Sequence, residues 1–150
     1  MRRVNGMPST RDATERIAFP QSLVDAMLQQ ARSAPQAEIC GLVAARRGRP
    51  LRCTAIANVA AEPQTRFSMD PQQQIDAFRS MREQGEELYG IYHSHPDGNS
   101  APSHTDIVEA AYPEALQFIV TLHGEAGPRV HAYRFRDGAA LPVQLEIGPD

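Results

Sequence analysis

"GIYHSHPDGNSAPSHTD", residues 90–106, decides how the rest of this chain is interpreted. It begins near the end of a strand predicted over 87–93 and carries His93 and His95 one residue apart. Alternate residues of a strand project from the same face. Two imidazoles on one face can share a single cation, so this stretch is a candidate metal site.

The second half of the stretch adds a carboxylate. Asp106 follows a short Pro/Gly/Asn loop and lies in the first turn of a helix predicted over 103–111. The loop is long enough to fold back and bring this carboxylate beside His93 and His95. Two histidines and one carboxylate leave a tetrahedral zinc with one open position, which is typical of catalytic rather than structural sites.

A simpler interpretation stays open for each half of the stretch. Ser103 and Asp106 have the spacing of a capping box, in which a hydroxyl and a carboxylate satisfy the first turn of a helix. A His-x-His pair on a strand is often only a pair of surface residues. The two interpretations of Asp106 are compatible, because Ser103 can cap the helix while Asp106 turns toward a metal.

The whole pattern is His-x-His, seven residues, Ser, two residues, Asp, and it resembles the signature of the JAMM (MPN-plus, Mov34/PAD-1) zinc metalloproteases. The resemblance covers roughly residues 16–136. The chain looks like the small bacterial stand-alone members, which are similar to sulfur-carrier peptidases of the CysO-cysteine type. This resemblance implies one α/β (α+β) domain with a mixed central sheet flanked by helices, an architecture like that of cytidine deaminases.

The same resemblance implies a role for each site residue. His93, His95 and Asp106 would bind one Zn²⁺ per chain. Glu38 stands in "AEICGLVAA" just before a predicted buried strand and would act as general base on the attacking water. Ser103 would donate a hydrogen bond to the tetrahedral oxyanion. Without the resemblance, Glu38 is an ordinary exposed glutamate after a helix.

Hydrophobic periodicity predicts a single domain over 16–150, preceded by a flexible segment at 1–15. Helices are predicted over 21–33 and after Asp70, which is a good N-cap followed by a proline suited to the first helical position. Strands are predicted over 16–19, 39–45, 51–60, 87–93, 115–122, 129–135 and 142–147. This order of elements indicates a mixed sheet with helices packed against it.

Composition excludes several classes of protein. All fifteen basic residues are arginine, so the chain has neither a Schiff-base lysine nor a P-loop lysine. A net charge of −3 and a pI of about 5.9 argue against a nucleic-acid partner. No apolar run reaches the length of a membrane helix. Cys40 and Cys53 form no CxxC pair and fit buried free thiols in a reducing compartment, so we expect a cytoplasmic protein. The sequence does not indicate an oligomeric state.

The sequence therefore predicts a peptidase that cuts after the C-terminal Gly-Gly of a small ubiquitin-like, ThiS/MoaD-type sulfur carrier, in a carrier-cysteine adduct or a longer tail. Asn58, Phe67 and Met69 are expected where an extended substrate tail adds beside the sheet.

Two alternative functions remain. A non-catalytic MPN scaffold would have lost metal ligands that this chain keeps. A RadC-like DNA-repair-associated protein usually has Asn where this chain has Ser94.

Overall fold

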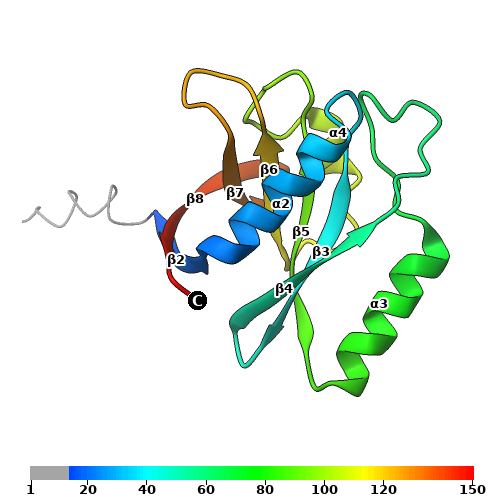
Figure 1. The fold of residues 1–150 in the computed structure, drawn as a ribbon, viewed down its shortest axis with the longest axis vertical. Helices are drawn as coiled ribbons and strands as arrows, with labels where there is room; N and C mark the ends of the chain where they lie inside the picture. Colours follow the sequence, from blue (N-terminus) through cyan, green and yellow to red (C-terminus); the bar gives the residue numbers. More distant parts are fainter. Residues whose placement is uncertain (1–13) are drawn as a thin grey trace, which may run out of the picture.

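The computed structural model describes residues 14–150, in which seven strands form one mixed sheet and three helices pack against it (Figure 1). The strand order is β2-β8-β7-β6-β5-β3-β4. The strands are β2 (Glu15–Pro20), β3 (Cys40–Arg46), β4 (Arg49–Ile56), β5 (Glu87–Ser94), β6 (Leu116–Thr121), β7 (Arg129–Arg136) and β8 (Ala139–Gly148). The helices are α2 (Gln21–Ser33), α3 (Pro71–Glu83) and α4 (His104–Val108).

The mixed character of the sheet comes from two parallel pairings. β2 runs parallel to β8 and β5 runs parallel to β6, while the other neighbours are antiparallel. The predicted α/β class with a mixed central sheet is therefore confirmed. The flexible segment expected at 1–15 stays a prediction, because residues 1–13 lie outside the described residues. Among residues 14–150, no helix is long and apolar enough to cross a membrane.

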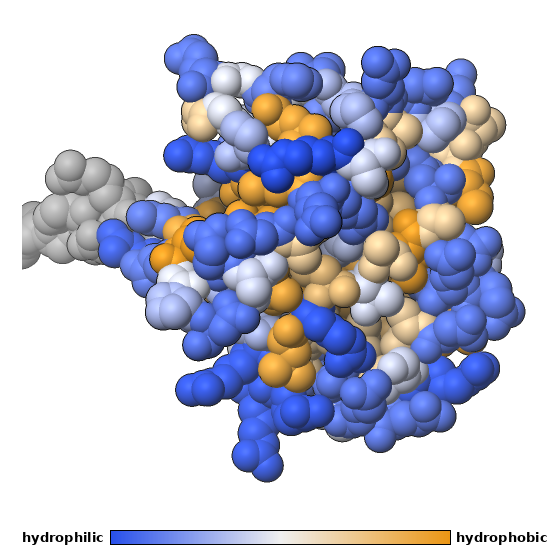
Figure 2. Space-filling view, in the orientation of Figure 1, coloured by the Kyte–Doolittle hydropathy of each residue, from blue (hydrophilic) through white to orange (hydrophobic). Residues whose placement is uncertain are grey.

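Helix α2 closes one face of the sheet, across which it lies in Figure 1. Its buried side chains recur at helical spacing and form one stripe: Leu23, Val24, Met27, Leu28 and Ala31. The stripe packs on large apolar side chains of the central strands, Tyr92 and Phe118 among them. The outer surface seen in Figure 2 is largely hydrophilic, with smaller hydrophobic patches between polar side chains.

Helix α3 covers the opposite face less completely. Asp70 accepts a hydrogen bond from the backbone N–H of Gln73, and proline begins the helix, as the sequence predicts. The helix buries only Ala77 and Met81 fully, in a cluster that includes Leu42 and Ile91 of the sheet. This face therefore keeps room for a pocket.

Alternation along β5 assigns side chains to the two faces. Tyr92 belongs to the apolar cluster under α2, and Ile91 belongs to the cluster under α3. Tyr92 donates its hydroxyl to Gln30 of α2. A Cβ on Gly41 would collide with that hydroxyl, so the start of β3 needs glycine at this point.

Two predicted elements are shorter in the structure. The strand predicted over 51–60 ends at Ile56, because the next backbone N–H, that of Ala57, is taken by the Gln73 side chain at 2.8 Å. The helix predicted over 103–111 ends at Val108. Its last residues leave the helix, since Tyr112 packs on Phe78 with ring centroids 5.4 Å apart. Tertiary contacts override local propensity in both places.

Candidate metal centre

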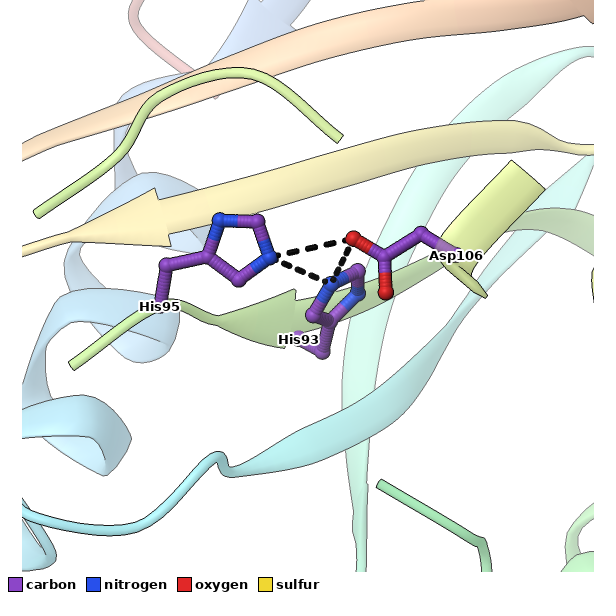
Figure 3. Close-up of side chains that lie close together, drawn as sticks. All are labelled: His93, His95 and Asp106. Carbon is purple, nitrogen blue, oxygen red and sulfur yellow. Dashed lines mark hydrogen bonds and ion pairs between the residues drawn. The ribbon is translucent and has the colours of Figure 1, made fainter. Parts of the chain in front are cut away.

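Three side chains meet beside the end of β5 (Figure 3). Nε2 of His93 lies 3.2 Å from Nε2 of His95. Oδ2 of Asp106 lies 3.2 Å from His93 Nε2 and 3.1 Å from His95 Nε2. The three atoms form a nearly equilateral triangle, and all three side chains point toward its centre. The predicted convergence of the two histidines and the aspartate is thus observed.

The triangle suits a small tetrahedral cation. Zinc bonds to histidine nitrogen and carboxylate oxygen are about 2.0–2.2 Å long, which places neighbouring ligand atoms about 3.3 Å apart in a tetrahedron. The observed separations of 3.1–3.2 Å are close to this value. Nitrogen and carboxylate donors are also the set that zinc prefers. The residues present therefore fit a metal ion.

A hydrogen bond fixes the orientation of His95. Its Nδ1 lies 2.7 Å from the backbone carbonyl of Asn99. A carbonyl can only accept, so Nδ1 carries a proton, and Nε2 of the neutral ring would be the atom that offers its lone pair to a cation. The loop between the halves of the motif thus holds one ligand in the tautomer that binds metals.

The charges of the cluster also favour cation binding. Burial tends to raise the pKa of Asp106, but hydrogen bonds from His93 and His95 outweigh burial and hold that pKa well below its ordinary value. Burial lowers the pKa of His93. For His95, burial acts in the same direction, but bonds to Asp106 and Asn99 raise the pKa above its ordinary value. An ionised carboxylate beside buried imidazoles is ready for a cation.

Asp106 performs both tasks that the sequence left open. Ser103 Oγ accepts from the backbone N–H of Asp106 at 3.0 Å, and Asp106 Oδ2 accepts from the backbone N–H of Ser103 at 2.8 Å. This is a complete capping box at the start of α4. The same Oδ2 forms the triangle with the histidines. Ser103 itself is exposed, and its hydroxyl proton is not used by the cap.

Glu38 lies just before β3, buried with 5 % of its surface exposed. It is not an ordinary exposed glutamate, although it does not join the three-residue cluster. Burial raises the pKa of Glu38 to about 7, with His95 lowering it and Asp106 raising it. Its Oε1 has no hydrogen-bond partner among residues 14–150. A carboxyl with this pKa is suited to exchange protons near neutral pH.

Ser94 and Asn58 hold the backbone around Glu38, a role that the sequence predicted for neither of them. Ser94 Oγ accepts from the N–H of Ile39 at 2.9 Å, which ties the segment after Glu38 to the strand of the histidines. Asn58 Nδ2 donates to the Glu38 carbonyl at 2.9 Å, and the Glu38 N–H donates to Pro63 at 2.7 Å. The Ser94 side chain thus faces away from the cluster. Nothing in the local sequence signals either contact.

A pocket of about 280 Å³ adjoins the cluster on the face of α3. His93 and Asp106 form part of its wall, together with Phe67 and Met69. The Phe67 ring stacks on the His93 ring with centroids 4.4 Å apart. Of the three residues expected beside a substrate tail, Phe67 and Met69 line this pocket, while Asn58 is occupied in holding the loop.

Two further histidines and Cys40 lie outside the cluster. His104 is exposed in the first turn of α4, and His131 pairs with Thr121 at 3.1 Å. Cys40 is fully buried, and burial raises the pKa of its thiol to about 12, which removes it as a nucleophile. Both cysteines are free.

Comparison with known proteins gives a consistent result. The family model for prokaryotic homologs of the JAB domain matches residues 20–136. A desampylase of Haloferax volcanii is 30% identical over 74% of this chain and 84% of its own. A CysO-cysteine peptidase of Mycobacterium tuberculosis is 34% identical over 83% of this chain and 86% of its own.

Solved structures agree with the fold. Protein DSY2949 from Desulfitobacterium hafniense has a TM-score of 0.78 and 27% identity, covering 89% of this chain and 93% of its own. AF2198, a JAB1/MPN domain protein from Archaeoglobus fulgidus, has a TM-score of 0.57 and 18% identity, covering 86% of this chain and 98% of its own. The second likeness concerns the fold alone.

Proposed function

We propose, because this chain belongs to the family of prokaryotic homologs of the JAB domain, that it is a zinc-dependent metallopeptidase. Its substrate is a small ubiquitin-like or sulfur-carrier protein, cut after the C-terminal Gly-Gly in a cytoplasmic reaction. The observation that carries the proposal is the triangle of His93, His95 and Asp106 atoms, 3.1–3.2 Å apart.

In this proposal His93, His95 and Asp106 hold one Zn²⁺, which when bound acts as a Lewis acid and makes water a better nucleophile. Glu38 accepts a proton from the attacking water and passes it to the leaving amine. Its raised pKa, about 7, suits both transfers. The Ser103 hydroxyl donates a hydrogen bond to the tetrahedral oxyanion, since its oxygen already accepts from the backbone N–H of Asp106 in the capping box.

The choice of substrate rests on the relatives. One is named a CysO-cysteine peptidase. A protein of Thermus thermophilus, 40% identical over 54% of this chain and 53% of its own, is named a probable TtuB-protein conjugate cleaving protease. A carrier tail ending in Gly-Gly is narrow, which suits a cluster buried at the end of a strand. The two free cysteines support a reducing compartment such as the cytoplasm.

The test is a mass-spectrometric cleavage assay. The substrate is a ThiS/MoaD-type carrier from the same genome that carries an extension after Gly-Gly. The enzyme is tested zinc-loaded, after chelation and after zinc is restored. The proposal predicts trimming to Gly-Gly that disappears on chelation and returns with zinc. No trimming by a protein that holds one zinc per chain would favour a non-catalytic scaffold instead.

A further inference from the structure

One polar residue at the floor of the pocket has no task in the mechanism. Gln117 belongs to β6 and is only 4 % exposed. Its Nε2 is buried and has no hydrogen-bond partner within residues 14–150. Nearly all buried donors in native proteins are paired, so an unpaired amide at a pocket wall indicates a partner that arrives with a ligand.

Packing does not explain a glutamine at this position. The strand reads "LQFIVT", and the other residues before Thr121 are apolar. Gln117 aligns with Ile91 of β5 in the parallel register, and both line the pocket. Two residues on, and hence on the same face, the strand has Ile119, which is fully buried. An apolar side chain would therefore suit the fold better at position 117.

The size of the pocket limits what it can hold. Its volume of about 280 Å³ is just below the range of small-ligand pockets, which is roughly 300–1,000 Å³. The walls combine apolar side chains such as Phe67 and Met69 with polar and charged ones, Arg66 and Glu109 among them. Such a space accepts one amino-acid residue and excludes a folded domain.

The proposed function decides which residue that is. On the carrier side of the scissile bond, both neighbouring residues are glycine and have no side chain to fill a pocket. The pocket shares His93 and Asp106 with the metal centre and so directly adjoins the bond that is cut. The residue on the leaving side, immediately after Gly-Gly, is the one next to the scissile bond whose side chain can fill this space.

We propose that this pocket binds the leaving residue and that Gln117 selects it, by donating a hydrogen bond from its carboxamide to the carbonyl or carboxylate oxygen of that residue. Gln117 is thus a specificity-determining residue, and the inference rests on the proposed peptidase function. The substrate class it favours is a carrier joined to an α-amino acid or peptide, over a carrier joined to a simple amine.

The decisive experiment pairs a change in the enzyme with a change in the substrate. Two carrier conjugates differ only after Gly-Gly: one carries alanine, and the other carries ethylamine, which lacks the carboxylate. Wild type is expected to cleave the alanine conjugate with a kcat/KM about tenfold higher, the effect of one hydrogen bond. Gln117→Met, which preserves volume, is expected to lose that preference. Gln144→Met, on the exposed surface of β8, is the matched control.

Two readouts separate this role from a structural one. Because Gln117→Met removes an unpartnered polar group, its Tm should rise by about 2–4 °C instead of falling. In the wild-type protein, the side-chain amide NMR resonance of Gln117, assigned from its loss in the variant, should shift when Gly-Gly-Ala is added. It should shift less with Gly-Gly-ethylamide.

The outcomes distinguish the two proposals. Suppose that wild type cleaves the conjugates and Gln117→Met prefers the alanine conjugate as strongly as wild type does, or that the Gln117 amide resonance does not shift. Either result would overturn the role of Gln117 and leave the proposed peptidase activity unaffected. A shift of the amide without cleavage of any conjugate would overturn the peptidase and leave the pocket as a binding site for this residue.

Discussion

The two faces of the sheet differ in how completely their buried groups are packed and hydrogen-bonded. Under α2, side chains such as Met27, Tyr92 and Phe118 are fully buried in an apolar cluster. Around the metal cluster and its pocket, Glu38 Oε1, His93 Nδ1 and Gln117 Nε2 are buried without hydrogen-bond partners among residues 14–150. Unpaired buried polar atoms cost stability, so the α2 face stabilises a domain whose other face is reserved for chemistry.

The largest expected effect is the loss of a metal ligand. Asp106→Asn keeps the shape of the capping box but removes the charge that attracts a cation. We expect zinc content to fall well below one per chain and cleavage to fall by about a thousandfold or more. Metal analysis and kcat/KM for a carrier conjugate check this, with Asp76→Asn on the exposed surface of α3 as control. Full activity in Asp106→Asn would show that Asp106 is not a metal ligand.

Glu38→Gln should separate activity from stability. Loss of the general base is expected to lower kcat by about 10²–10⁴-fold. The folded-state pKa of Glu38, about 7, lies above its ordinary value of 4.5. Protonated Glu38 therefore adds to the free energy of unfolding, and this contribution is complete below pH 4.5. It is lost as the pH rises through about 7, and the loss is on the order of 3 kcal/mol.

The metal-free Gln variant should therefore be more stable than wild type at pH 8 and similar to it near pH 4.5. Urea unfolding in the presence of chelator at the two pH values measures this difference. A variant that is less stable than wild type at pH 8 would contradict the buried, unpaired state of Glu38.

On the α2 face, a substitution should lower stability and leave activity nearly unchanged. Met27→Ala under α2 creates a cavity in the apolar cluster and should cost about 2–5 kcal/mol of unfolding free energy. Its kcat, counted per folded molecule, should stay within twofold of wild type. Denaturant unfolding and active-site titration give the two numbers. A large change in kcat at full folding would show that the two faces are not independent.

The smallest effect is expected at Ser94. Ser94→Ala removes the acceptor for the Ile39 N–H and so loosens the segment that carries Glu38. We expect kcat to fall about fivefold with zinc content unchanged, since one buried hydrogen bond is worth about 1 kcal/mol. Ser80→Ala, on α3, serves as control. A change in KM alone would place the effect on substrate binding instead of on Glu38.

The sequence predicts best what lies close together along the chain. The metal ligands and Ser103 fall within fourteen residues, so spacing alone brings them to one place, and the capping box is local too. The helices follow from caps and apolar stripes. Glu38 could be selected only through the family resemblance, since no pattern in the neighbouring sequence predicts that its side chain is buried.

The contacts that hold Glu38 could not be predicted, because they join distant segments. Ser94 meets Ile39 across 55 positions, and Asn58 meets Glu38 across 20. Gln117 did carry a signal, because it is the one polar residue of β6 before Thr121. The shortened α4 shows the same principle, because Tyr112 is drawn toward α3 by packing that local propensity does not record.

The most direct test of the proposed chemistry is the single-turnover cleavage rate of a carrier conjugate by zinc-loaded Glu38→Gln beside zinc-loaded wild type. We expect both proteins to hold one zinc per chain and to bind the conjugate equally, and only wild type to release a carrier ending in Gly-Gly. Cleavage by Glu38→Gln at the wild-type rate would contradict this expectation, because the buried carboxyl would then have no part in the chemistry.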